Sequence, residues 1–239
     1  MTKIISTVVL GLLTVLTSCF AYGKQCVVLL HGMARTESSM AKMAIELHNE
    51  GYTVSNYGYP STSLTIEEIS LHHVPAAIAK CGDVDKINFV THSLGGIVLR
   101  QYLTLNVLEN LGHVVMLGPP NKGSEVVDKL GHIPGFELIN GPAGMQLGTG
   151  ENSVPNSLGA VSYTVGIIAG SSTFNPMLSQ LLPNPDDGKV SVERTKVEGM
   201  TDHVVLPVTH TFMMRNDDVI KQVKTFLKTG KFIPHETGS

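Results

Sequence analysis

The sequence has little charge, no basic run and no internal repeat. Lys and Arg total 17 and Asp and Glu total 20, giving a formal net charge of −3. The positive surface with which nucleic-acid-binding proteins neutralise phosphates is therefore lacking, and nucleic acid is not an expected partner. The 24 glycines and 12 prolines follow no fixed period, which excludes collagen-like and solenoid folds. With 42% apolar and 15% charged residues over 239 positions, the composition instead predicts a folded chain with a substantial core.

Long apolar runs are also absent, apart from one near the N-terminus. Residues 4–16 are mostly apolar, follow Lys3, and precede small and turn-forming residues at 17–23. The run is shorter than the ~20 apolar residues that usually cross a bilayer, and its arrangement is typical of a signal peptide. We therefore expect residues 1–23 to be removed on export, leaving residues 24–239 as a single periplasmic or secreted domain.

The cleavage position has two interpretations. Cleavage after Ala21 or Gly23 would release a soluble exported protein. The segment 16–19, Leu-Thr-Ser-Cys, instead resembles the lipobox of bacterial lipoproteins, which would leave a lipidated Cys19 and a protein anchored in the outer membrane. We favour soluble export and keep the membrane-anchored lipoprotein as the alternative.

Cysteine is scarce, and only two of the three cysteines lie outside the predicted signal peptide. Cys26 and Cys81 are a candidate disulfide in an exported chain, and two buried free thiols are the alternative. No Cys-x-x-Cys or His-x-x-x-His spacing occurs, so the sequence predicts no structural zinc site. It implies no other metal and no cofactor.

Short β-rich runs alternate with longer helical patterns from residue 25 onward. Strands are predicted at 26–30, 52–57, 86–90, 113–117, 163–169 and 204–208, and helices at 36–49, 64–80, 94–106 and 216–228. Pro75 should bend or split the second helix. Strands that alternate with helices indicate an α/β fold with a doubly wound, mostly parallel central sheet of about six strands.

Residues 121–162 interrupt this alternation. The stretch is rich in Gly, Pro and Asn, and only residues 124–130 have a convincing helical pattern. Such an excursion is usually a cap over a site rather than a linker. No shift in composition marks a second domain, so we expect a short cap on a single domain.

The strongest functional signal is a serine between a predicted strand and a predicted helix, in the sequence Phe-Val-Thr-His-Ser-Leu-Gly-Gly at residues 89–96. A serine on such a sharp turn stands above the sheet, and the first amides of the helix point at the same space. Gly95 and Gly96 supply the room that a strained turn needs. The motif resembles the nucleophile elbow of the α/β-hydrolase superfamily in its lipase and esterase form, with Ser93 as nucleophile. Thr91 departs from this pattern, which usually has glycine there.

A second motif resembles the same family. The sequence His-Gly-Met at residues 31–33 follows the first predicted strand, as the HG motif of the oxyanion loop does. The resemblance implies that the amides of Met33 and Leu94 form the oxyanion hole. His31 and His92 are expected to have structural roles.

The family order places an acid and then a histidine after the serine. Residues 183–190 resemble its acid loop, and the Asp-Gly-x-Val pattern selects Asp187 as the catalytic acid, with Asp186 as the alternative. His210 follows the last predicted strand, where the family has its base. His203 lies at the other end of that strand, about 16 Å away, and is rejected on that distance.

The resemblance covers residues 26 to about 231 and is nearest to small bacterial lipases, whose minimal fold lacks the first two strands of the fuller architecture. In that topology the strands that lead to His31 and Ser93 are neighbours, which would bring Cys26 and Cys81 close together. Asn121 stands where lipases frequently have a histidine, in a segment expected to shape the pocket wall.

The resemblance implies a serine hydrolase that cleaves carboxylic esters through an acyl-enzyme on Ser93. A thioesterase, amidase or acyltransferase with the same residues is the alternative within this chemistry. A catalytically silent acyl-binding protein of the envelope is the alternative from another class. The polar composition of residues 121–162 favours an open pocket and smaller or more soluble esters.

Overall fold

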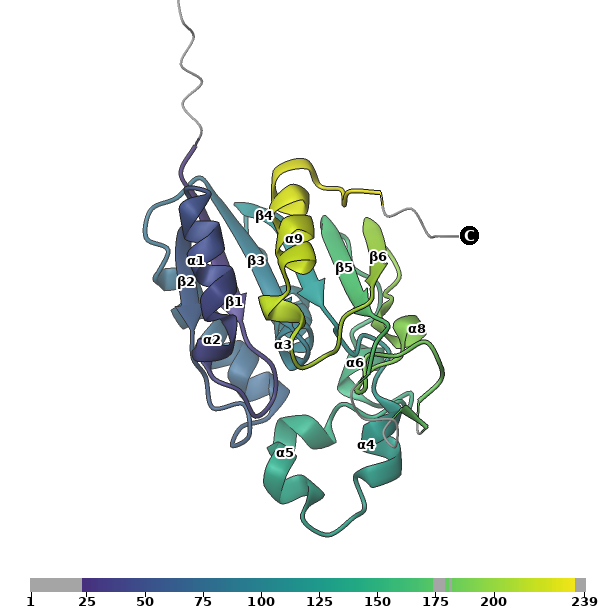
Figure 1. Ribbon diagram of the computed structural model, residues 1–239. Coiled ribbons are helices and arrows are strands. Elements are labelled where there is room, and N and C mark those ends of the chain that lie inside the picture. The colour runs from purple at the N-terminus through teal and green to yellow at the C-terminus, as the bar shows by residue number, and fades with distance from the viewer. Residues whose placement is uncertain (1–22, 174–178, 181, 235–239) are drawn as a thin grey trace, which may run out of the picture.

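A sheet of six parallel strands forms the centre of the described chain (Figure 1). The structure is a computed structural model and describes residues 23–173, 179–180 and 182–234. The strand order is β2-β1-β3-β4-β5-β6. The strands are β1 (Gln25–Leu30), β2 (Thr53–Tyr57), β3 (Lys86–His92), β4 (Leu111–Leu117), β5 (Val165–Gly170) and β6 (Asp202–Leu206). The predicted α/β class and the predicted parallel sheet are confirmed.

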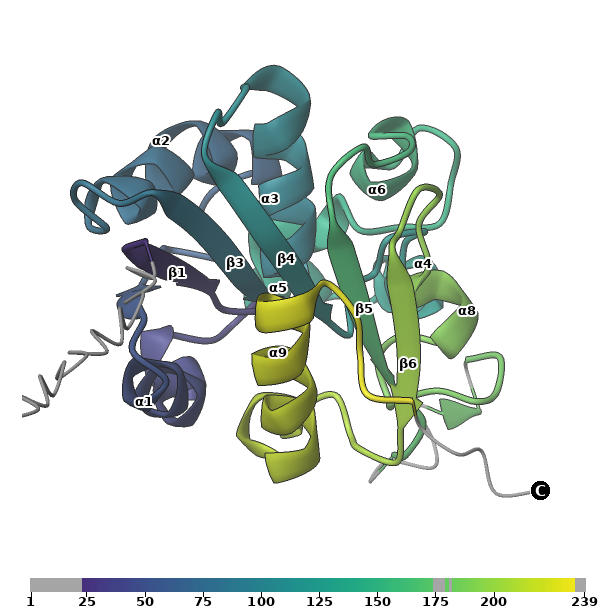
Figure 2. The same ribbon diagram turned by 90° about the horizontal axis from the view of Figure 1, so that it is seen from above.

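Helices cover both faces of this sheet (Figure 2). One face carries α1 (Ala41–Asn49) and α9 (Asp217–Thr229), and the other carries α2 (Ile66–Ala79) and α3 (Leu94–Leu105). This arrangement explains why β1 is an unbroken apolar run. Val27 and Leu29 pack in the α1/α9 cluster while Val28 and Leu30 pack in the α2/α3 cluster, and all four are fully buried.

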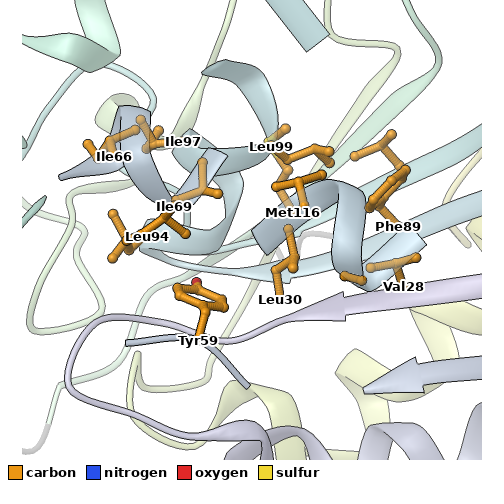
Figure 3. Close-up of a cluster of buried hydrophobic side chains, with 14 of the residues drawn as sticks. Val28, Leu30, Tyr59, Ile66, Ile69, Phe89, Leu94, Ile97, Leu99 and Met116 are labelled. Carbon is orange, nitrogen blue, oxygen red and sulfur yellow. The ribbon is translucent and has the colours of Figure 1, made fainter. Parts of the chain in front are cut away.

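The core between the sheet and α2/α3 includes Leu94, the residue that follows Ser93 (Figure 3). Side chains from β1, β3 and β4 meet those of α2 and α3 there, and Leu94, the first residue of α3, is fully buried among them. The start of α3 is thus anchored by its own hydrophobic packing. The labelled members of this cluster are Val28, Leu30, Tyr59, Ile66, Ile69, Phe89, Leu94, Ile97, Leu99 and Met116.

Local capping fixes the ends of two of these helices. Thr65 and Glu68 form a capping box at the start of α2, in which each side chain accepts from the other's backbone amide. The side chain of Asn216 accepts from the amides of Asp218 and Val219 at the start of α9, and Gly230 ends that helix in the left-handed conformation. The remaining elements are η1 (Glu37–Met40), α4 (Glu125–Leu130), α5 (Phe136–Met145), α6 (Val154–Ser157), α8 (Val192–Thr195) and η2 (Met213–Arg215).

Helix α2 corrects the prediction that Pro75 would split it. The helix runs without interruption from Ile66 to Ala79, with Pro75 inside. The carbonyl that loses its helical donor belongs to Leu71, whose residue is 65% exposed, so water can donate to it instead.

The excursion over residues 121–162 is more helical than predicted. Besides α4, it contains α5 and α6, whereas the sequence indicated only residues 124–130. Helix α5 is two helical pieces joined at Gly141, where φ is 66° and Pro142 follows. These two residues break the periodic pattern by which a helix is recognised in sequence. In Figure 1, α4 and α5 lie beyond the carboxyl ends of the strands, in the position of a cap.

The predicted signal peptide and Cys19 lie outside the described residues, apart from Gly23, so the signal peptide stays a prediction. Within the described part of the chain, no helix has the length and apolar character needed to cross a bilayer.

A disulfide joins Cys26, at the start of β1, to Cys81, just after α2, with a Cα–Cα distance of 5.7 Å. The pairing follows from the sheet, because β1 is hydrogen-bonded to β3 and the two strands begin side by side. The bridge ties α2 to the amino edge of the sheet, at the opposite end from the elbow.

This disulfide should contribute measurably to stability. It spans 55 residues of sequence, and the loss of loop-closure entropy predicts about 4 kcal/mol of stabilisation for a loop of this size. We expect the Cys26→Ala/Cys81→Ala variant to lose about 2–4 kcal/mol of unfolding free energy in urea titrations followed by circular dichroism. The wild type in excess reductant should lose a similar amount. Two free thiols in non-reducing mass spectrometry of the exported protein would contradict the pairing.

Candidate active site

Ser93 occupies a strained turn between β3 and α3. Its φ is 52° and its ψ is −121°, a conformation that residues other than glycine rarely adopt. The backbone behind the turn is closely packed. A Cβ atom added to Gly95 would lie 2.6 Å from the carbonyl oxygen of Leu30. The end of β1 is thus pressed against the first turn of α3. This geometry raises the Ser93 side chain above the sheet while the α3 amides open toward the same side.

The Ser93 hydroxyl, the His210 ring and the Asp187 carboxylate form a chain of hydrogen bonds. Nδ1 of His210 lies 2.7 Å from Oδ2 of Asp187, and Nε2 lies 2.9 Å from Oγ of Ser93. Since a carboxylate can only accept, Nδ1 is the donor in the first bond. Nε2 of the neutral ring is then free to accept the proton of the serine hydroxyl.

The two adjacent acids in the loop after β5 have different partners. The other carboxylate oxygen of Asp187 accepts from the amides of Lys189 and Val190, so the side chain is held at both ends. Asp186 instead accepts from the hydroxyl of Ser179 and the amide of Gly188. Of the two predicted candidates, the structure therefore places Asp187 against the histidine and Asp186 in the support of the loop.

His210 lies on a loop rather than directly after the last strand. Strand β6 ends at Leu206, two residues earlier than predicted, because Pro207 has no amide hydrogen to continue the ladder. The loop is fixed by the amide of His210, which donates to the carbonyl of Asp187. His203 lies within β6, with Nε2 3.0 Å from the hydroxyl of Thr195, and takes no part in the chain.

The other two histidines near the turn have structural contacts. The His31 ring stacks on Tyr59 at a centroid distance of 4.0 Å, and its Nε2 accepts from the Tyr59 amide. Nε2 of His92 lies 3.0 Å from the carbonyl oxygen of His210. Burial is the main cause that lowers the pKa of His92 well below its ordinary value, so the ring is neutral and holds the His210 loop in place.

A cavity of about 380 Å³ opens onto Ser93 and His210. Met33 and Arg35, from the loop after β1, lie on its wall. This loop is close to Ser93, since a Cβ atom on Gly32 would lie 3.3 Å from Cβ of Ser93. Much of the remaining wall is apolar and comes from the α4–α5 region, namely Val126, Val127, Leu130, Phe136, Ile139 and Leu147.

The fold is shared with solved lipase structures. The mature form of the Bacillus licheniformis lipase BlEst2 superposes with a TM-score of 0.64 at 16% identity, over 88% of this chain and 93% of that one. An extracellular alpha/beta-hydrolase from a Paenibacillus species gives a TM-score of 0.55 at 15% identity, over 86% and 99% of the two chains. The chain has the α/β-hydrolase fold. No protein-family model and no curated protein sequence matches it.

A third α/β-hydrolase structure matches only in part. Phospholipase PlaB from Legionella pneumophila gives a TM-score of 0.64 at 18% identity, and the match covers 84% of this chain but 57% of that one. The match thus spans little more than half of the phospholipase's length.

Sequence reasoning missed Arg100, which joins helix α3 to both ends of the 121–162 excursion. Its guanidinium is buried and donates to the carbonyl and side-chain oxygens of Asn121 and to the carbonyl of Gly159. One side chain on α3 therefore holds both ends of the excursion. Asn121 also donates to the carbonyl of Thr195, so its amide is a structural link at this point. An arginine inside an apolar helix segment, seven residues after Ser93, is the signal that could have found this link.

The close packing behind the elbow predicts the effect of a single added methyl group. Gly95→Ala would place a Cβ against the carbonyl oxygens of Leu30 and His31, neither of which is a side chain that can move aside. We expect thermal unfolding to show a loss of about 1–3 kcal/mol. Gly150→Ala is the matched control, because nothing lies within 4 Å of its Cβ position, and it should change stability by less than about 0.5 kcal/mol. Equal unfolding midpoints for the two variants would contradict this account of the turn.

Proposed function

We propose that this protein is a serine hydrolase that cleaves carboxylic esters, of the lipase and esterase type. The observation that carries the proposal is the hydrogen-bonded chain from Asp187 through His210 to Ser93 at the wall of an apolar cavity. The α/β-hydrolase fold, shared with lipases and a phospholipase, is consistent with it. A hydroxyl paired with an imidazole that is itself oriented by a carboxylate is the arrangement that activates serine at neutral pH.

The reaction begins when Oγ of Ser93 attacks the ester carbonyl carbon and its proton passes to Nε2 of His210. The resulting imidazolium is stabilised by Asp187, and the developing oxyanion accepts from the amides of Met33 and Leu94. His210 then gives its proton to the departing alcohol oxygen as the carbon–oxygen bond breaks, which leaves the acyl group on Ser93. Water repeats the attack with His210 as base, and the carboxylic acid leaves as Ser93 regains its proton.

The apolar part of the cavity is where the acyl chain would lie. Val126, Val127 and Leu130 of α4 and Phe136 and Ile139 of α5 line it without a charged side chain among them. The polar composition of residues 121–162 favoured smaller or more soluble esters, whereas the side chains of the cap that line the cavity are mostly apolar. Acyl chains longer than those of the most soluble esters therefore fit the proposed activity.

We also propose that the protein acts after export. The Cys26–Cys81 disulfide supports this location, because disulfides persist in oxidising compartments. Signal cleavage and lipidation at Cys19 concern residues outside the described part, and N-terminal sequencing of the mature protein would decide between a soluble and an anchored form.

Variants of the proposed triad test the mechanism. We expect Ser93→Ala to lower kcat/KM on p-nitrophenyl esters at least about a thousandfold and to abolish labelling by a fluorophosphonate. Asp187→Asn should cost about as much, because the histidine loses the partner that fixes its tautomer. Asp186→Asn is the matched control in the same loop and should retain most of the activity. Ser93→Ala with full activity, or Asp186→Asn as the more damaging acid variant, would overturn the assignment.

The position of the acyl chain is tested by two neighbouring residues of α5. Ile139 lines the cavity, whereas Leu138 does not line it and is 88% exposed. On p-nitrophenyl esters of increasing chain length, Ile139→Ala should lower the ratio of long-chain to short-chain kcat/KM about threefold to tenfold, since apolar contacts with the distal carbons are lost. Leu138→Ala should leave the ratio unchanged. The same ratio in both variants and the wild type would place the acyl chain elsewhere.

A further inference from the structure

Two cations stand on the wall of the cavity that holds Ser93. Arg35 lies two residues beyond Met33 on the loop after β1, and Lys189 lies two residues beyond Asp187 on the loop after β5. Both residues are exposed, and both line the cavity. Since Ser93 follows β3, which lies between β1 and β5 in the sheet, the two loops approach it from opposite sides.

The side chains of Arg35 and Lys189 form no ion pair or hydrogen bond with the described residues. Their neighbours differ in this respect, because Nζ of Lys122 lies 3.1 Å from a carboxylate oxygen of Glu193 and Nε of Arg194 lies 2.9 Å from one of Glu125. The carboxylate of Glu37, the acid nearest to Arg35 in sequence, lies against Gly58. Arg35 and Lys189 thus keep their charge available to a molecule in the cavity.

Acidic side chains do not offset this charge on the cavity wall. The described residues that line the cavity include no Asp and no Glu. The nearby carboxylate of Asp187 is fully buried and engaged with His210 and two amides. Arg35 lies close enough to the site for its charge to add to the effect of burial in lowering the pKa of His92. A chain with a net charge of −3 therefore presents a locally positive cavity, which attracts anions.

We infer that Arg35 and Lys189, the cationic rim, select acyl esters whose alcohol part carries an anionic group. The inference rests on the proposed ester hydrolysis and names the substrate class of the same site. The anion belongs to the alcohol part because the acyl part is assigned to the apolar lining, where a charge would be left without a partner. A carboxylate on a soluble ester and the phosphate of an anionic lipid headgroup share this chemistry.

A pair of chromogenic esters isolates the charge. We would compare o-nitrophenyl octanoate with its ring-carboxylated analogue, which has the same acyl chain and differs only in the carboxylate that its nitrophenol leaving group carries. The measured quantity is the charge preference, defined as kcat/KM for the carboxylated ester divided by kcat/KM for the neutral one. The Arg35→Gln/Lys189→Gln variant should lower this preference about fivefold, and each single variant should lower it by less. Lys221→Gln removes one charge from an exposed position on α9, outside the cavity lining, and should leave the preference unchanged.

Salt gives a second readout that needs no variant. Exposed charges are screened within about 10 Å at an ionic strength of about 0.1 M, so added sodium chloride should lower the charge preference of the wild type. It should have little effect on the charge preference of the double variant. The inference is overturned if the charge preference is the same in the wild type and the double variant. It is also overturned if sodium chloride does not change the charge preference of the wild type.

Failure of the underlying function has a separate signature. If neither ester is hydrolysed in a Ser93-dependent way, the proposed function itself is wrong. If both are hydrolysed but the charge preference is unaffected by the double variant, ester hydrolysis stands and the cationic rim does not.

The two sources of the anion are separated with lipids below their micellar concentrations. We would compare short-chain phosphatidylglycerol, which is anionic, with phosphatidylcholine of the same chains, which is zwitterionic. A wild-type preference for phosphatidylglycerol that the double variant loses supports a lipid headgroup as the anion. A charge preference confined to the carboxylated soluble ester supports a small soluble substrate. The inference is overturned if the wild type prefers neither phosphatidylglycerol nor the carboxylated soluble ester.

Discussion

The strained backbone at Ser93 is the constraint on which the rest of the site depends. A positive φ at a residue with a side chain is unfavourable by itself, so the surrounding packing must hold it. Leu94 is buried beneath the turn in the α2/α3 core, and Gly95 is pressed against the end of β1. The hydrophobic core and the reactive hydroxyl are therefore not separate features. The packing that buries Leu94 also sets the direction in which Oγ points.

Parallel strands explain why so much of the site could be predicted from sequence. All six strands end at one edge, so residues that follow β3, β5 and β6 meet there although 117 positions separate Ser93 from His210. Ser93, Asp187 and His210 each stand in a loop that follows a recognisable apolar run. The Asp-Gly-x-Val pattern predicted Asp187 with Asp186 as the alternative, but it could not give the directions of the two side chains, which differ between these adjacent residues of the loop.

The features that sequence did not reveal depend on contacts between distant segments or on broken patterns. Helix α5 was missed because Gly141 and Pro142 interrupt its periodicity, while the fold tolerates a kink there. Pro75 was expected to bend or split α2, yet the helix continues through it, and Leu71, whose carbonyl loses its helical donor, is an exposed residue. In the sequence, Arg100 is a single polar residue in an apolar segment. Its hydrogen bonds to Asn121 and Gly159 can be recognised only in the folded chain, where these distant residues lie beside it. Which apolar side chains of the cap line the cavity could not be predicted from the sequence for the same reason.

Arg100 holds both ends of the cap through one buried guanidinium, which stands on the helix that begins after Ser93. Further links join the segment between Asn121 and Gly159 to the α/β body, since the Ser124 hydroxyl donates to the carbonyl of Lys189 and the Gln146 side chain accepts from the amide of Ile66. The cavity-lining side chains of Val126, Leu130 and Phe136 are not part of these links. Substitutions at these three positions can therefore change what enters the cavity while the attachment of the cap and the hydrogen-bonded chain stay in place.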